Sequence, residues 1–370
     1  MALDLSSLRR HPDVEAPNLY AVDATDRLLL DEAAAAIVEH PDAVVVVDDH
    51  YGALTIGARG LGARKLRVHQ DSVVGERALA GNARARDVDD VVNVPLTAGA
   101  LAGAEVVLWQ LPGSLDRLDA VARVLAEAVA PDAVVYAGGR IKHMTTGMNE
   151  VLRRHFDRLD VSLARQKSRV LIAREPRIST PDPSRVDEYA EWGMRLIEAP
   201  GVFAGGRLDL GARALLAALD HIDPGARTAV DLGCGAGVLS VALARLRPEL
   251  AITATDTSAA AVDATLANLA LNEVTTVTVT RDDCGSNILD ASVDVVLLNP
   301  PFHSGTTVHT GIAQRMFAAA ARMLRPGGEL WAVYNSPLSY RSDLTRMVGP
   351  TREVSRNPKF TVTVSEARGS

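Results

Sequence analysis

The segment Val230–Ser240, which reads VDLGCGAGVLS, constrains the fold of this chain more than any other. An apolar run ending at Asp231 predicts a buried strand, and Val238–Leu246 predicts a helix. The turn between them carries three alternate glycines, Gly233, Gly235 and Gly237. Glycine lets a backbone turn tightly and approach a ligand, and a helix N-terminus offers unpaired N–H groups to an anion. The pattern therefore predicts a ligand-binding turn in a parallel α/β sheet.

Residues around this turn indicate which cofactor it binds. The next predicted strand, Ala251–Asp256, ends in a carboxylate that could accept both hydroxyls of a ribose. The dinucleotide pattern GxGxxG would need a glycine where Val238 stands, and Asp231 would repel a pyrophosphate but could receive an α-ammonium. We expect Asp283 to accept from an adenine amine. S-adenosylmethionine is therefore favoured over a nicotinamide dinucleotide. The predicted cofactor-binding residues are Asp231, Gly233, Cys234, Gly235, Asp256, Thr257, Asp283 and Asn299.

A tetrapeptide, Asn299-Pro-Pro-Phe302, follows the predicted strand Val293–Leu298 and should face the glycine turn. The lone pair of an amine conjugated to a base is delocalised, so such an amine is a poor nucleophile. The Asn299 side-chain oxygen and the Pro300 carbonyl could each accept one N–H and so orient the amine. A planar base could stack on Phe302. We predict catalytic roles for Asn299, Pro300 and Phe302; His303 could line the substrate pocket or face solvent.

β-branched runs alternate with helical runs along the whole chain, which is typical of βαβ units. Prolines at 176, 181 and 183 favour an extended linker. We predict an α/β protein with two tandem Rossmann-like methyltransferase domains, each a mostly parallel sheet with helices on both faces. The predicted bounds are 1–175 and 200–370, with a linker at 176–199. The strands expected in the second half are Thr228–Asp231, Ala251–Asp256, Thr275–Thr280, Val293–Leu298 and Glu329–Tyr334.

The two halves resemble each other in order, which indicates a duplication. Val106–Pro112 is the counterpart of Val295–Pro301, and Val44–Asp48 is that of Arg227–Asp231. His50-Tyr-Gly52 then stands opposite the first two glycines of the turn. A bulky side chain there would keep a ligand away from the backbone. The N-terminal copy is therefore predicted to be degenerate, with the fold kept and the chemistry lost.

Composition and charge limit the partners. Apolar residues make up 47% of the 370 residues, enough for two cores, and no apolar run is long enough to cross a membrane. With two cysteines and no zinc-like spacing, we expect a cytoplasmic protein without a metal. The net charge is −7, so contact with RNA would need a local basic patch. Residues 140–174 are rich in Lys and Arg, and within them Arg153 and Arg154 are predicted to contact substrate; a solvated helix face is the alternative.

The chain resembles the ribosomal RNA guanine-N2 methyltransferases of the RsmC/RlmG type over nearly its full length. The segments that carry the resemblance are Pro200–Arg213, Asp231–Gly237, Asn299–His303, Arg356–Val362, Asp48–Leu54 and Gly139–His143. The resemblance implies methyl transfer to the exocyclic N2 of a guanosine in ribosomal RNA or a ribosomal subunit, with the degenerate domain helping to hold RNA. We expect a monomer, because two joined domains can replace a dimer.

Three alternatives remain at this point. The tetrapeptide would suit adenine N6 or a protein glutamine amide as acceptor. A nicotinamide dehydrogenase would leave the segment from Asn299 to Phe302 unexplained. A non-catalytic RNA-binding or assembly factor would not need the intact glycine turn.

Overall fold

The protein is described by a computed structural model, which covers residues 4–179, 184–301 and 307–369. The chain divides into two compact units, residues 1–182 and 183–370. Each unit is a sheet between two layers of helices, and each is described by itself below.

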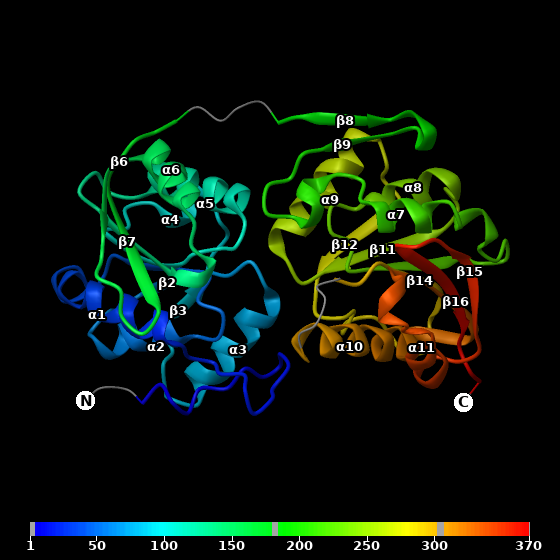
Figure 1. Ribbon diagram of the computed structural model, residues 1–370, viewed down its shortest axis with the longest axis horizontal. Coiled ribbons are helices and arrows are strands. Elements are labelled where there is room, and N and C mark those ends of the chain that lie inside the picture. The colour runs from blue at the N-terminus through cyan, green and yellow to red at the C-terminus, as the bar shows by residue number, and fades with distance from the viewer. Residues whose placement is uncertain (1–3, 180–183, 302–306, 370) are drawn as a thin grey trace. The chain divides into compact units, whose positions relative to one another are not determined.

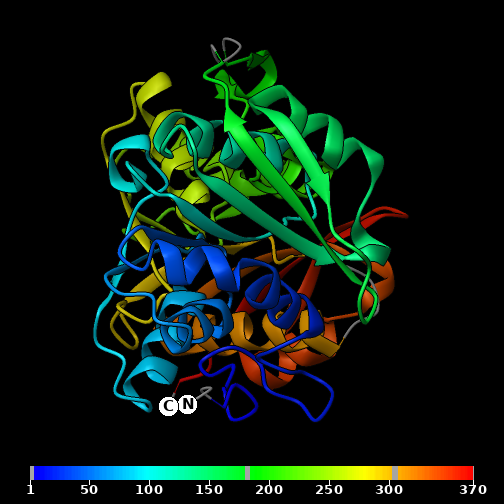
Figure 2. The same ribbon diagram turned by 90° about the vertical axis from the view of Figure 1, so that its left-hand side faces the viewer.

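Within residues 4–179, seven strands form one sheet in the order β3-β2-β1-β4-β5-β7-β6. The neighbours from β3 to β5 are parallel, and β7 is antiparallel to both β5 and β6. The strands are β1 (Val44–Val47), β2 (Leu66–His69), β3 (Val91–Asn93), β4 (Val106–Gln110), β5 (Val134–Arg140), β6 (Phe156–Val161) and β7 (Ser168–Pro176). The antiparallel pair β6–β7 is seen in green in Figure 2.

Helices cover both faces of this first sheet (Figure 1). One face packs on α1 (Ala24–Glu39), α2 (Ala53–Gly60) and α3 (Val73–Arg84), and the other on α4 (Ala98–Leu101), α5 (Leu115–Ala128) and α6 (Thr146–His155). All four valines of β1 are buried, with Val44 and Val46 in the first layer and Val45 and Val47 in the second. A strand buried on both faces reads as an unbroken apolar run, which explains the sequence VVVV.

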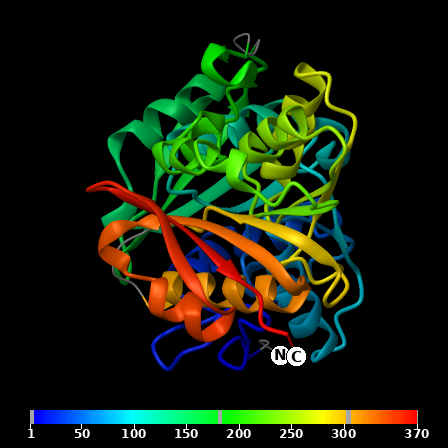
Figure 3. The same cartoon turned by 90° about the vertical axis from the view of Figure 1, so that its right-hand side faces the viewer.

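The second unit repeats this topology. Within residues 184–301 and 307–369, seven strands form a sheet in the order β12-β11-β10-β13-β14-β16-β15, again with an antiparallel pair at one edge. The strands are β10 (Thr228–Leu232), β11 (Ala251–Asp256), β12 (Val277–Arg281), β13 (Val293–Leu298), β14 (Leu324–Asn335), β15 (Thr351–Arg356) and β16 (Phe360–Glu366). One face packs on α7 (Leu210–Leu216), α8 (Val238–Leu246) and α9 (Ala259–Leu271), and the other on α10 (Thr307–Met323) and α11 (Arg341–Met347) (Figure 3).

The predicted fold class is confirmed, but the linker prediction is wrong in part. Residues 186–197 form a hairpin of β8 (Val186–Tyr189) and β9 (Met194–Ile197). Met194 and Leu196 are buried in the core of the second unit, and the Ile197 N–H donates to Asn268 Oδ1 on α9 at 2.7 Å. This stretch is therefore part of the second unit, which begins before residue 200. Apolar residues at alternate positions, here Met194 and Leu196, indicate a strand with one buried face. This pattern could have shown that the stretch belongs to a folded unit.

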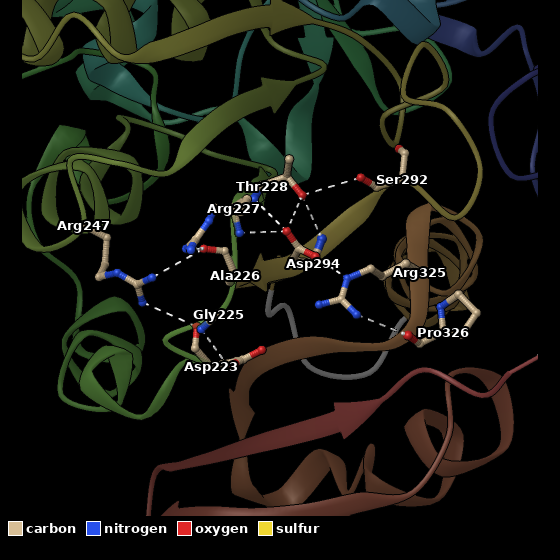
Figure 4. Close-up of polar contacts among 10 residues, drawn as sticks. All are labelled: Asp223, Gly225, Ala226, Arg227, Thr228, Arg247, Ser292, Asp294, Arg325 and Pro326. Atoms are coloured by element: carbon tan, nitrogen blue, oxygen red, sulfur yellow. Dashed lines mark hydrogen bonds and ion pairs between the residues drawn. The ribbon is translucent and has the colours of Figure 1, made fainter.

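A hydrogen-bonded network joins the amino ends of β10 and β13, the edge opposite the glycine turn (Figure 4). The Asp294 carboxylate accepts from the backbone N–H groups of Arg227 and Thr228, both at 2.8 Å, and from the Arg325 guanidinium. Burial alone would raise the pKa of Asp294, but these donors hold it below its usual range. The network fixes the start of β10, and with it the register that delivers the glycine turn.

No helix among the described residues is long and apolar enough to cross a membrane.

Candidate active site

The glycine turn after β10 has the geometry that its sequence predicts. Gly233, Gly235 and Gly237 have φ values of 80°, 55° and 74°, in the left-handed region. Gly237 is the N-cap of α8 and has no side chain with which to cap it. The first N–H groups of α8 therefore have no acceptor on the side chain of the cap residue, and they can donate to a carboxylate.

Asp231 lies at the base of this turn. It is 2% exposed, and its Oδ2 accepts from the Ser240 hydroxyl on α8 at 2.6 Å. Burial raises the pKa of Asp231 to about 6, against the hydrogen bonds from Ser240. A nearby cation stabilises the ionised form of a buried carboxylate, and an α-ammonium group would be such a cation.

Asp256 ties the second strand to the turn. Its Oδ2 accepts from the Gly235 N–H and its Oδ1 from the Ser258 N–H, each at 2.9 Å. Each carboxylate oxygen has a second lone pair, so both can also accept a hydroxyl. Thr257 is half-buried beside it. Cys234 is buried, with its sulfur 3.4 Å from the Thr265 hydroxyl, so its side chain is used within the unit.

Asp283 is already paired. It is 8% exposed, and its Oδ2 lies 2.5 Å from Arg315 Nη2 on α10. An adenine amine would have to be accepted by the remaining oxygen. The ion pair, which the sequence did not indicate, fixes the orientation of this carboxylate.

Asn299 is held in one orientation by Asp209, a residue that sequence reasoning missed. Asn299 Nδ2 donates to Asp209 Oδ2 at 3.2 Å, whereas Asn299 Oδ1 is buried and has no hydrogen-bond partner among the described residues. Asp209 is the N-cap of α7, and its Oδ1 accepts from Gly211 N at 2.7 Å and Ala212 N at 3.1 Å. The carboxylate selects the amide orientation, so the acceptor oxygen of Asn299 is left open for a donor.

The glycine turn and the tetrapeptide begin at the same edge of the sheet. β10 and β13 are adjacent and parallel, and Leu232 lies opposite Leu298. Gly233 and Asn299 each follow directly on this pair. Pro300 is buried next to Asn299, while Phe302 and His303 lie outside the described residues. The structure thus brings together the cofactor turn and the first half of the predicted catalytic tetrapeptide.

Comparisons with known proteins agree on one family. The model of the RLMG N-terminal domain matches residues 2–177, and that of the methyltransferase small domain matches residues 193–364. A ribosomal RNA large subunit methyltransferase G of Streptomyces avermitilis is 34% identical over 372 residues, covering 96% of this chain and 95% of the relative. Its namesake in Pseudomonas aeruginosa strain UCBPP-PA14 is 35% identical, covering 96% of both chains. The chain belongs to the methyltransferase G family. The predicted family and enzyme class are thereby confirmed.

A solved structure shows the same fold over both units. The T. thermophilus 16S rRNA N2 G1207 methyltransferase (RsmC), in complex with AdoMet and guanosine, matches with a TM-score of 0.74 at 21% identity, covering 94% of this chain and 92% of that chain. The tandem arrangement is therefore shared with a second methyltransferase.

The first unit of this methyltransferase G family member has the same turn with other residues. Gly52 and Gly237 are both left-handed N-caps of the helix after the first strand, and Ser72 and Ser258 are the N-caps of the helix after the second. Counting back from these caps pairs His50 with Gly235, Asp48 with Gly233, Val46 with Asp231 and Gln70 with Asp256. The strand register agrees, because Val47 lies opposite Trp109 as Leu232 lies opposite Leu298.

The predicted pairing of His50-Tyr-Gly52 with Gly233-Cys-Gly235 is therefore wrong by two residues. The physical reason is that Asp48 and His50 adopt the left-handed conformation, with φ of 54° and 58°, without being glycines. Matching glycine to glycine in the sequence consequently misplaced the turn.

Arg153 and Arg154 lie on α6 in the first unit, and both are exposed. Arg154 pairs with Asp119 at 3.3 Å. Other cations of the basic stretch also have acidic partners: Arg158 and Arg174 with Asp160, and Arg165 with Asp31. These pairs offset much of its positive charge, so contact between Arg153, Arg154 and RNA stays a prediction.

Among the described residues, no group of three or more His, Cys, Asp or Glu side chains is arranged to hold a metal ion.

Proposed function

We propose that this methyltransferase transfers the methyl group of S-adenosylmethionine to the exocyclic N2 amine of a guanosine in ribosomal RNA. The observation that carries the proposal is Asn299, whose open acceptor oxygen is fixed by Asp209 at the sheet edge where the glycine turn begins. The relatives named above are ribosomal RNA methyltransferases, and the RsmC structure is a complex with AdoMet and guanosine. These names support the choice of cofactor and acceptor.

The residues around the turn suit the three parts of the cofactor. The N–H groups at the start of α8 would bind its carboxylate, Asp231 its ammonium and Asp256 the ribose hydroxyls. Asp283 would bind the adenine amine, and Gly233, Cys234, Gly235 and Thr257 lie in the two loops that surround these groups. When bound, the cofactor supplies an electrophilic methyl group on a sulfonium.

The tetrapeptide would position the acceptor amine. Asn299 Oδ1 accepts one N–H and the Pro300 carbonyl accepts the other, which points the nitrogen lone pair away from both. Pro300 has no N–H of its own, so it adds no competing donor at this point. Phe302, with His303, would then line the pocket beside the base.

The partner is proposed to be ribosomal RNA or a ribosomal subunit, contacted in part through Arg153 and Arg154. We also propose that the protein acts as a monomer in the cytoplasm. The relatives' names state a ribosomal RNA large subunit methyltransferase, and the two arginine contacts, the monomer and the cytoplasm go further than these names.

The deciding experiment maps modified nucleosides by mass spectrometry in ribosomal RNA from cells with and without this protein. We expect one N2-methylguanosine to disappear in the deletion strain and to return with the wild-type chain but not with Asn299→Ala. If every N2-methylguanosine persists in the deletion strain, the assignment fails. Loss of N6-methyladenosine instead, or of a methylated glutamine in protein, would transfer the same chemistry to another acceptor.

A further inference from the structure

The first unit contains a cavity at the edge where β1 and β4 end. Its volume is about 420 Å³, within the range of small-molecule sites, and it is lined only by residues of the first unit. Asp26, Asp49 and Gln110 contribute polar groups, and Met144 and Met148 contribute apolar surface. The position corresponds to the catalytic edge of the second unit, because Gln110 comes directly after the pair Val47–Trp109 as Asn299 comes directly after the pair Leu232–Leu298.

The side-chain amide in this cavity is held as Asn299 is held. Gln110 Nε2 donates to Asp26 Oδ1 at 2.5 Å, and Asp26 lies in the first turn of α1. The Asp26 carboxyl is 4% exposed, and its other oxygen accepts from the Asp23 N–H at 2.7 Å. In each unit, therefore, a carboxyl at the start of a helix, α1 or α7, accepts a hydrogen bond from the side-chain amide of Gln110 or Asn299. This leaves the carbonyl oxygen of the amide as the free acceptor.

The cofactor half of the site is closed in the first unit. Asp49 is buried, and its two oxygens accept from the Leu54 N–H at 2.7 Å and the Thr55 N–H at 2.8 Å, at the start of α2. These are the helix N–H groups that a cofactor carboxylate would need. What remains open is the acceptor half, around Gln110.

We propose that this cavity binds, without methylating it, an unpaired nucleotide whose base carries an exocyclic amine. Gln110 Oε1 accepts an N–H of the base, in the role that Asn299 Oδ1 has in the second unit. Met144 and Met148 supply an apolar, polarisable surface for a flat ring. Arg10 and Arg140 also line the cavity; each has an acidic neighbour, Asp13 at 2.8 Å and Asp23 at 4.0 Å, and the remaining N–H groups of each guanidinium can donate to a phosphate. The nucleotide can be free or part of a single-stranded RNA, since the recognition chemistry is the same.

Methionine methyl signals in the full-length chain can locate the binding. The chain has seven methionines, of which Met144 and Met148 line the cavity and Met316 packs against Gly233 in the second unit. The probe is guanosine 5′-monophosphate, titrated into protein labelled with ¹³C at the methionine methyls and saturated with S-adenosylhomocysteine. We expect saturable shifts of the Met144 and Met148 signals. Shifts confined to Met316 would overturn the proposal and leave the methyltransferase function untouched.

Two variants test the chemistry. Gln110→Leu keeps the size of the side chain and removes the acceptor, and we expect affinity at Met144 and Met148 to fall at least tenfold while the Met316 response is unchanged. Gly139→Ala narrows the cavity and leaves Gln110 and Asp26 in place, because its Cβ would meet Met144 at 3.4 Å and Leu111 at 3.5 Å, which are ordinary contacts. It should also weaken binding. Wild-type affinity in both folded variants would contradict the site.

Two further ligands define what is recognised. Inosine 5′-monophosphate lacks the amine and should bind several-fold more weakly; equal binding would contradict recognition of the amine. A single-stranded RNA pentamer with one guanosine among uridines tests the source. Tighter binding of the pentamer than of the mononucleotide assigns the site to RNA, and equal binding assigns it to the free nucleotide.

Discussion

The turns after β1 and β10 share their backbone course but differ in what stands at the left-handed positions. In the second unit these positions are glycines, and a side chain at Gly235 would project into open space. In the first unit they are Asp48 and His50. A non-glycine residue in this conformation costs about 1 kcal/mol or more, so the first unit keeps the backbone path of the second at a cost in free energy.

The carboxylates differ in the same way. In the second unit Asp231 accepts from Ser240 and the N-cap residue of α8 has no side chain, whereas in the first unit Val46 replaces Asp231 and Asp49 caps α2. Gln70 likewise replaces the Asp256 of the second unit. A helix N-terminus that is satisfied by its own chain no longer attracts an anion. The comparison teaches that the first unit satisfies with its own Asp49 the helix N–H groups that the second unit leaves for a ligand.

The largest effect should come from Asn299, which follows β13, and not from Gln110, its counterpart at the end of β4. Asn299→Ala removes the acceptor that orients the amine, and we expect kcat to fall about 10²–10³-fold, as for the loss of one oriented hydrogen-bonding group in a transition state. Isothermal titration with S-adenosylhomocysteine should give an unchanged Kd. The matched variant Gln110→Ala should leave kcat at saturating RNA unchanged, even where it weakens the binding of RNA to the first unit. Equal loss of activity in the two variants would break the comparison.

A second test contrasts Asp256 with Gln70. Asp256→Ala removes the acceptor of two proposed charge-assisted hydrogen bonds to the ribose, each worth about 1.5–3 kcal/mol, so cofactor affinity should fall about 10- to 100-fold for each bond lost. Gln70→Ala should not change it. Because Asp256 also binds the Gly235 N–H, Asp256→Asn serves as a control that keeps the loop tethered. An unchanged Kd in Asp256→Ala would remove the ribose assignment.

The sequence predicted the second unit better than the first for identifiable reasons. The observed α8, β11 and β13 have the predicted bounds, since glycine, apolar runs and strand-end polar residues are local signals. β15 and β16 were missed; β15 is a largely exposed edge strand with no apolar run. Asp209 was missed because its partner Asn299 is 90 residues away and an N-cap looks the same with or without a second role.

The cap in the first unit gives a smaller, stability-based test. Asp49→Ala leaves the Leu54 and Thr55 N–H groups without their acceptor, and the loss of such a cap costs about 0.5–2 kcal/mol. The thermal unfolding midpoint should fall by about 1–8 °C in calorimetry. Asp49→Asn, which keeps one acceptor oxygen, should lie between. Wild-type stability in Asp49→Ala would show that the Asp49 carboxylate does not cap α2, and so does not take the place of a cofactor carboxylate there.

The last test uses the ionisation of Asp231, for which the first unit has only Val46. Its pKa of about 6 is raised by burial, so its contribution to folding is largest below its unfolded pKa near 4 and is lost as pH rises through about 6. Stability alone cannot isolate this group, because burial also raises the pKa of Asp49 to about 6 and of Asp26 to about 8.

Cofactor affinity can isolate the ionisation of Asp231. An ammonium beside Asp231 favours the ionised form, so affinity for S-adenosylhomocysteine should rise up to about tenfold between pH 5 and pH 7 and then level off. Asp231→Asn should flatten this profile at the lower affinity, and a wild-type profile in that variant would mean that another group receives the ammonium.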